Sequence, residues 1–137
     1  MRVLIDTNIL VDAASFRIPF YKSAQDIIRF CGEGKIEGFI SSHSLSNIFY
    51  ILRKEYDYDE RKKIITLLRK SMKTVVISND MIDAALANDK ITDFEDALQY
   101  ECAEEMNAEY IVSRDKNGYS KMPIKTVTAE ELVNLLS

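Results

Sequence analysis

The chain has 137 residues, of which 47% are apolar and 29% are charged, and its net charge is −4. This composition is typical of a folded domain with a sizeable core, and it excludes disordered, collagen-like and coiled-coil chains. No apolar run reaches roughly 20 residues, the length that crosses a bilayer, and the run before Asp6 is too short for a signal peptide. We therefore expect a cytoplasmic protein with a single domain over residues 1–137.

The first half of the chain alternates short apolar runs with segments of helical periodicity. Short apolar runs predict buried strands, and apolar residues spaced three and four apart predict amphipathic helices. The predicted elements are strands at 3–5 and 36–40 and helices at 21–31, 44–56 and from a cap at Asp59 to Met72. Cys31 and Cys102 both fall in predicted helices, where we expect buried thiols, and with one histidine they cannot form a structural zinc site.

The second half continues the alternation. Thr92 with Glu95 and Thr128 with Glu131 match the capping-box pattern that opens a helix. The predicted elements are strands at 74–77, 110–113 and 124–127 and helices from Ser78 to Ala87, from Thr92 to about Asn107 and from Thr128 onward. Strands that alternate with helices predict an α/β fold, a three-layer α/β/α sandwich with a mostly parallel central sheet.

Residues 53–73 form a basic segment in an otherwise acidic chain. Eight basic and four acidic side chains give this segment a charge of +4 and leave −8 on the remainder. Such a segment faces either a phosphate backbone or simply solvent. Tyr50, Tyr56 and Tyr58 lie beside it as candidate stacking surfaces for bases, although Tyr50 and Tyr56 could equally pack in the core, an interpretation we favour for Tyr50.

Four aspartates fall where a parallel sheet would bring them together. Asp6 follows the first strand, Asp115 follows the strand at 110–113, and Asp93 and Asp96 lie on one face of a helix start. Each has an ordinary structural explanation as a cap, a helix-dipole partner or a turn residue. Together they would meet beyond the carboxyl ends of the strands and repel, unless a hard divalent cation such as Mg²⁺ or Mn²⁺ neutralises them. We expect Asp6→Asn to relieve that repulsion and stabilise the metal-free protein.

The order of these motifs resembles the PIN-domain family over nearly the whole chain. The resemblance is carried by VLIDTNIL at 3–10, SSHSLSNI at 41–48, DFEDAL at 93–98 and IVSRD at 111–115. It implies an endoribonuclease that hydrolyses RNA phosphodiesters with Mg²⁺ or Mn²⁺, of the kind found as the toxin of a toxin–antitoxin pair. The implied partners are single-stranded or structured RNA, an antitoxin protein and a second copy of the chain in a homodimer.

The resemblance also assigns roles to particular residues. Asp6, Asp96 and Asp115 would bind metal, with Asp93 as a further acid. Asn47 stands where many members carry glutamate; it would orient a water but supplies no charge, which leaves a non-catalytic binding or regulatory module as the alternative. Side chains that would aim the carboxylates or touch substrate are Thr7, Asn8 and Ser113. His43 is expected at the surface near a helix start without a role, although its position four residues before Asn47 could make it face the same cleft.

Two other classes fit the motifs poorly. An aspartate-nucleophile phosphatase needs a second acid two residues after the first, where this chain has Asn8. A phosphoacceptor receiver domain needs paired acids after the first strand and an aspartate after a middle strand, where this chain has Ser41 and Ser42.

Overall fold

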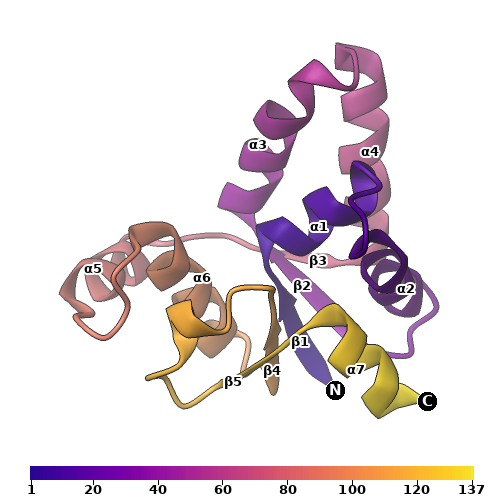
Figure 1. The fold of residues 1–137 in the computed structure, drawn as a ribbon. Helices are drawn as coiled ribbons and strands as arrows, with labels where there is room; N and C mark the ends of the chain where they lie inside the picture. The colour runs from indigo at the N-terminus through magenta and orange to yellow at the C-terminus, as the bar shows by residue number, and fades with distance from the viewer.

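A computed structural model describes residues 1–137 and shows one five-stranded sheet in which every strand pairing is parallel. The strand order is β3-β2-β1-β4-β5 (Figure 1). The strands are β1 (Arg2–Ile5), β2 (Glu37–Ser41), β3 (Lys73–Val75), β4 (Tyr110–Val112) and β5 (Lys125–Val127). The chain therefore runs from the central strand β1 out to one edge of the sheet, and then returns to the other side of β1.

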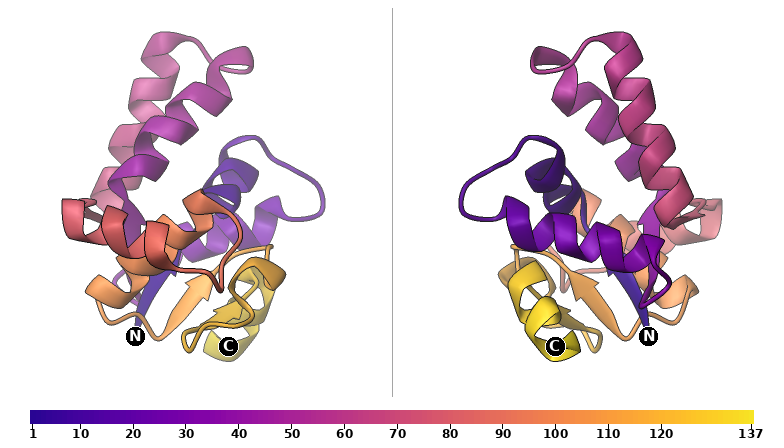
Figure 2. Two further views of the ribbon diagram at one scale, coloured as in Figure 1. Left: turned by 90° about the vertical axis from the view of Figure 1, so that its left-hand side faces the viewer. Right: turned by 90° about the vertical axis from the view of Figure 1, so that its right-hand side faces the viewer.

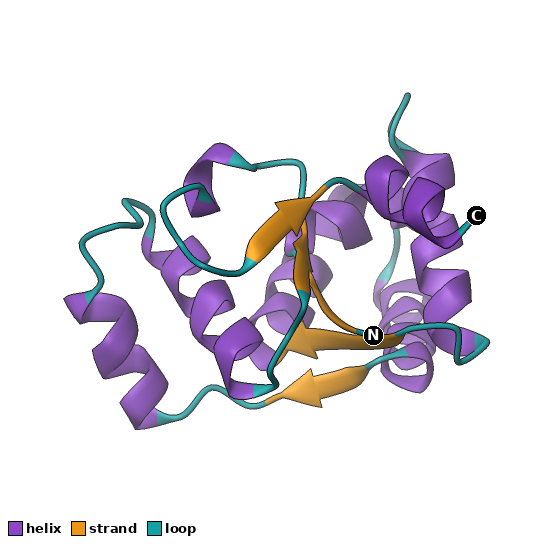
Figure 3. Ribbon diagram, turned by 90° about the horizontal axis from the view of Figure 1, so that it is seen from below, coloured by secondary structure: helices purple, strands orange, loops and turns teal.

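Helices cover both faces of the sheet and give the three expected layers (Figure 3). On β1, Val3 and Ile5 face one apolar cluster and Leu4 faces the other, because successive strand side chains point to opposite faces. The first cluster includes residues of α1 (Thr7–Ala14), α2 (Tyr21–Gly32), α3 (Ser42–Ile51), α4 (Tyr58–Ser71) and α7 (Ala129–Leu136). The second includes residues of α5 (Asn79–Ala87) and α6 (Phe94–Glu105). The predicted three-layer α/β fold is confirmed.

Helices α3 and α4 form an arm that extends away from the sheet (Figures 1 and 2). They are joined through a short 3₁₀ turn at Leu52–Lys54, and the arm carries the basic segment. The predicted cap at Asp59 is wrong. Asp57 caps α4, since its side chain accepts from the Glu60 backbone N–H at 2.8 Å while Glu60 accepts from the Asp57 N–H at 3.0 Å. Tyr50 is exposed rather than in the core, whereas Tyr56 packs against the core and donates to the Ala14 carbonyl.

Other expectations differ from the structure at two helix starts. Helix α1 was not expected after Asp6; the carboxylate of Asp6 accepts from the Thr7 N–H and opens the helix there. Helix α6 begins one residue later than the capping-box pattern predicts, because Asp93 rather than Thr92 is the cap and accepts from the Asp96 N–H.

The caps at Ser78 and Thr128 are confirmed, and both cysteines are free and buried. None of the helices combines the length and apolar character needed to span a bilayer.

Candidate active site

The candidate site lies beyond the carboxyl ends of β1 and β4, which are hydrogen-bonded neighbours with Ile5 opposite Val112. Strand order changes direction at β1, because the chain places β2 on one side of it and β4 on the other. In open parallel sheets this is where ligands bind. A cleft of about 250 Å³ opens here and is lined by Asp6, Thr7, Asn8, Val11, Arg17, His43, Asn47, Ile51, Glu95, Asp96, Gln99 and Asp115.

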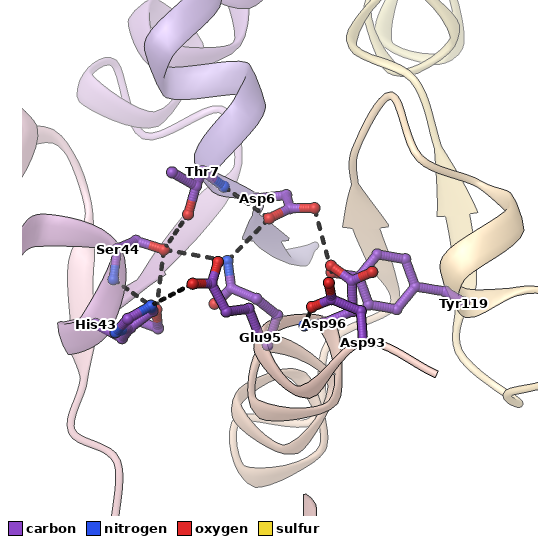
Figure 4. Close-up of polar contacts among 10 residues, drawn as sticks. Asp6, Thr7, His43, Ser44, Asp93, Glu95, Asp96 and Tyr119 are labelled. Atoms are coloured by element: carbon purple, nitrogen blue, oxygen red, sulfur yellow. Dashed lines mark hydrogen bonds and ion pairs between the residues drawn. The ribbon is translucent and has the colours of Figure 1, made fainter. Parts of the chain in front are cut away.

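Asp6 is buried at the floor of this cleft and accepts four hydrogen bonds. Its Oδ1 accepts from the Thr7 backbone N–H at 2.8 Å and from Gln99 Nε2 at 3.0 Å. Its Oδ2 accepts from Ser113 Oγ at 2.7 Å and from the Tyr119 hydroxyl at 3.2 Å. These donors come from α1, α6 and the segment after β4, so three separate parts of the chain fix one carboxylate (Figure 4).

Asp96 faces Asp6 from the first turn of α6. The Tyr119 hydroxyl lies 3.4 Å from Asp96 Oδ1, so this hydroxyl stands between the two carboxylates. Partial burial, followed by repulsion from Asp6, Asp93 and Asp115, raises the pKa of Asp96 to about 7. The negative charges of the other three acids therefore do converge on Asp96.

Asp115 completes the group from a tight turn after β4. Its backbone N–H donates to Ser113 Oγ at 3.0 Å, and its Oδ1 accepts from the Gly118 N–H at 3.0 Å. A Cβ at Gly118 would lie 2.7 Å from Asp115 Oδ2 and 2.8 Å from Asp96 Oδ2. Both carboxylates thus border the same small space, and only glycine leaves that space open.

A partly buried ion pair holds this turn against α1. Asp12 is fully buried, and Arg114 binds it with two hydrogen bonds, from Nε at 2.7 Å and from a terminal nitrogen at 3.1 Å. The Arg114 backbone N–H also donates to Asn8 Oδ1 at 3.3 Å. Since Arg114 directly precedes Asp115, these contacts fix the position from which the Asp115 carboxylate projects.

The structure brings most of the predicted residues together. Thr7, Asn8 and Asn47 line the cleft with the three central aspartates, and Ser113 lies beneath it bonded to Asp6. Asp93 does not line the cleft; it is exposed at the start of α6, where it caps the helix. His43 lies in the first turn of α3 with its side chain 39% exposed, and it faces the same cleft as Asn47, 3.6 Å from Glu95 (Figure 4).

Sequence reasoning missed several polar residues of the site. Gln99 lies three residues after Asp96 and therefore on the same helix face, a spacing that could have identified it. Its Nε2 joins Asp6 to Ser44 Oγ, which in turn lies 2.7 Å from Thr7 Oγ1. Tyr119 carries no comparable signal, because it lies in a polar loop with no periodicity.

The donor set fits a hard divalent cation. No three acidic, histidine or cysteine side chains are grouped as a complete metal site. The cleft nevertheless offers carboxylate oxygens of Asp6, Asp96 and Asp115, the side-chain carbonyl of Asn47, and Gln99 Oε1, which is buried without a hydrogen-bond partner. Oxygen donors of this kind are preferred by Mg²⁺ and Mn²⁺.

Comparisons with known proteins show what the whole chain is similar to. Ribonuclease VapC1 of Aquifex aeolicus (strain VF5) is 26% identical over 137 residues, which cover 95% of this chain and 92% of the relative. A solved toxin-antitoxin complex from Klebsiella pneumoniae has a TM-score of 0.72 at 22% identity and covers 93% of this chain and 97% of its own. VapC20 of Mycobacterium tuberculosis, described as a sarcin-ricin loop cleaving toxin, has a TM-score of 0.69 at 12% identity, with 88% and 95% covered.

The two solved structures share the fold of this chain at low sequence identity. A family model of the PIN domain matches residues 2–117, which include β1, β4 and all three aspartates of the cleft. The resemblance read from the opening motif and the later acidic motifs is confirmed, and the chain belongs to the PIN-domain family.

Proposed function

We propose that this chain is a divalent-metal-dependent endoribonuclease that acts as the toxin of a toxin–antitoxin pair. The observation that carries the proposal is the convergence of Asp6, Asp96 and Asp115 on one cleft beyond β1 and β4. The naming of the relative from Aquifex aeolicus as a ribonuclease supports the reaction. The description of the Klebsiella pneumoniae structure as a toxin-antitoxin complex supports the biological role and an antitoxin protein as partner, and the description of VapC20 as a toxin supports the role.

Asp6, Asp96 and Asp115 would hold Mg²⁺ or Mn²⁺. Such an ion supplies a nucleophilic water at neutral pH and neutralises charge that develops on the phosphate. The protein's own contribution is orientation: Ser113 and Gln99 fix the Asp6 carboxylate, and backbone contacts fix Asp115. Such supporting hydrogen bonds keep ligands aimed at the metal.

The remaining cleft residues would act on the substrate and on water. Asn47 lines the cleft without charge, so its amide orients a water rather than neutralising a cation. Thr7 and Asn8 stand in the cleft wall as polar contacts for the substrate. Arg17 is a cation in the cleft wall and is suited to a phosphate of the incoming strand.

RNA is the substrate that this surface suits best. The arm formed by α3 and α4 carries the basic segment, and Tyr50 and Tyr58 are each 59% exposed on it. Basic side chains bind the phosphates of a strand, and exposed aromatic rings stack on its bases. A second copy of the chain is a further proposed partner.

The experiment is an RNA cleavage assay with purified protein in Mn²⁺ and in chelator. We expect cleavage only in Mn²⁺, and a loss of at least about a hundredfold in Asp96→Asn or Asp115→Asn, since each removes a metal ligand. The control is Asp83→Asn on the exposed face of α5, which should cleave like the wild type. Expression in bacteria should arrest growth with the wild type and not with Asp96→Asn.

The second candidate is a PIN fold that binds RNA or a partner without cleaving, and Asn47 in the cleft is the observation that favours it. The same samples distinguish the two functions. Mn²⁺ that raises the melting temperature without any RNA cleavage would support the non-catalytic module. Restoring the acid with Asn47→Glu should then produce Mn²⁺-dependent cleavage.

A further inference from the structure

All the acceptor positions of Asp6 are in use. A carboxylate offers about four lone-pair directions to hydrogen-bond donors. Asp6 fills them with the Thr7 N–H, Gln99 Nε2, Ser113 Oγ and the Tyr119 hydroxyl, at distances between 2.7 and 3.2 Å. A cation that binds Asp6 directly must therefore replace one of these four donors.

Three of the four donors have no freedom to leave. The Thr7 N–H is the next backbone amide in the chain. Gln99 is 3% exposed, and its Nε2 is also held by Ser44 Oγ at 3.1 Å. Ser113 Oγ accepts from the Asp115 N–H at 3.0 Å and from Asn8 Nδ2 at 3.2 Å, so both of its acceptor positions are filled and its proton stays directed at Asp6.

Tyr119 is the donor that can yield. Its hydroxyl makes the longest of the four contacts, at 3.2 Å, and it shares its single proton with Asp96 Oδ1 at 3.4 Å. The hydroxyl stands between the two carboxylates, where a cation shared by Asp6 and Asp96 has to bind (Figure 4). The ring itself is held in the second apolar cluster and is 1% exposed, so a small rotation rather than a large movement would free the carboxylates.

We infer that the Tyr119 hydroxyl competes with the divalent cation for Asp6 and Asp96 and thereby sets the affinity of the site. This inference rests on the proposed metal site. Tyr119→Phe leaves the ring in place and removes the competing donor, so a lone pair of Asp6 becomes available. It also removes the one hydrogen bond that moderates repulsion between the two carboxylates, which makes cation binding more favourable. Tyr119 is thus a positioning residue: its hydroxyl orients the carboxylates of Asp6 and Asp96 and weakens metal binding.

The test is calorimetric titration of Mn²⁺ into chelator-treated, dialysed protein. We expect Tyr119→Phe to bind Mn²⁺ about tenfold more tightly than the wild type, the effect of removing one competing hydrogen bond to a charged group. The matched control is Tyr100→Phe. Tyr100 is also 1% exposed and lies in the same apolar cluster, but its hydroxyl has no hydrogen-bond partner, so its variant should bind like the wild type.

Melting temperatures distinguish competition from a purely structural role. Tyr119→Phe should melt below the wild type in chelator and show a larger rise on addition of Mn²⁺. A structural role alone would lower the melting temperature in both conditions without tightening binding. If Tyr119→Phe does not fold, replacing Tyr119 with 3-fluorotyrosine keeps the ring and strengthens the donor, so Mn²⁺ binding should weaken.

Two results would overturn the inference. They differ in whether the proposed metal site would also be refuted. If the wild type binds Mn²⁺ and Tyr119→Phe binds it equally or more weakly, the competition is refuted while the metal site stands. If the wild type shows neither heat of binding nor thermal stabilisation with millimolar Mn²⁺, the proposed metal site fails and the inference fails with it.

Discussion

Asp6 and Asp96 face each other across the cleft, yet their surroundings differ. Asp6 is buried and accepts four hydrogen bonds. Asp96 has one long contact with a hydroxyl, and its pKa is raised to about 7 by burial and by the neighbouring acids. The repulsion expected from the sequence therefore acts on Asp96. Asp6→Asn would point an amide N–H at donors that need an acceptor, so it should lower the stability rather than raise it as expected from the sequence.

We predict that Asp96→Asn stabilises the metal-free protein at neutral and higher pH. Because the pKa rises from 3.8 to about 7 on folding, the folded protein binds more protons than the unfolded chain between these values. The free energy of unfolding therefore falls as the pH rises through this window, and the full penalty applies above it. The variant should gain on the order of 1 kcal/mol above pH 7 after allowance for solvent screening, and nothing below about pH 4.

Urea unfolding in chelator at several pH values measures this difference. Asp83→Asn on the exposed face of α5 is the control and should parallel the wild type at every pH. A stability difference between Asp96→Asn and the wild type that stays constant with pH would show that Asp96 does not titrate in the cleft.

Asp93 and Asp96 should differ in function although both lie at the start of α6. Asp93 caps the helix outside the cleft, and asparagine is an equally good cap, so Asp93→Asn should keep both the stability and most of the RNA cleavage. Asp96→Asn removes a cleft carboxylate and should abolish cleavage. Parallel assays of the two variants measure this contrast; a silent Asp96→Asn beside an inactive Asp93→Asn would reverse the assignment.

Among the elements, the turn after β4 keeps open the space between the Asp96 and Asp115 carboxylates. We predict that Gly118→Ala disrupts Mn²⁺ binding and cleavage, because the added Cβ would meet Asp115 Oδ2 at 2.7 Å and Asp96 Oδ2 at 2.8 Å. The control is Gly32→Ala at the end of α2, where the nearest atom to the added Cβ is Ser71 Oγ at 3.6 Å, an ordinary van der Waals distance. Calorimetry with Mn²⁺ should show weaker binding for the first variant and no change for the second.

The same turn is anchored to α1 through the pair of Arg114 and Asp12. We predict that Arg114→Met destabilises the protein by about 3 kcal/mol, since removal of this partner leaves a fully buried carboxylate without its nearest counter-charge. Arg17 lies farther from Asp12, at 3.9 Å, and is more exposed, so Arg17→Met should cost less than about 1 kcal/mol. Urea denaturation measures the free energy of unfolding of both variants. An equally small loss in Arg114→Met and Arg17→Met would mean that the pair of Arg114 and Asp12 contributes little to stability.

The elements show what local sequence determines. All five predicted strands exist, because short apolar runs with polar ends have few alternatives in a chain of this size. Helix α1 was missed because its start depends on Asp6 serving as a cap as well as a buried site residue. The site could be predicted as far as Asp6, Asp96 and Asp115, which sit at element ends. Tyr119 and the pair of Arg114 and Asp12 could not, because their contacts join positions 23 to 113 residues apart.

At the scale of the whole molecule, charge is divided between an acidic cleft and a basic arm. Lys54, Lys63 and Lys70 are exposed on or beside the arm helices and make no ion pair. We predict that replacing all three with glutamine weakens RNA binding in chelator and lowers the slope of log affinity against log salt by about 2, or roughly 0.7 for each phosphate that a lysine no longer neutralises. Fluorescence anisotropy over a salt series measures the slope.

A matched triple variant separates the arm from net charge. Lys22, Lys90 and Lys121 are also exposed but lie outside the arm, and their replacement with glutamine gives the same net charge. Its salt slope should match that of the wild type. Equal slopes for both triple variants would mean that RNA does not bind along the arm.

The parallel sheet also determines when the site can form while the chain is being synthesised. Asp115 comes close to Asp6 because β4 pairs with β1, which places Val112 opposite Ile5. The two paired residues are far apart in the sequence. Contacts this distant in sequence form late and slowly. A ribosome-bound chain that has emerged only as far as α6 already contains Asp6 and Asp96, but it has neither the third carboxylate nor Ser113 and Tyr119 to hold the first. The proposed metal site is consequently incomplete in the nascent polypeptide until β4 and the turn after it have docked.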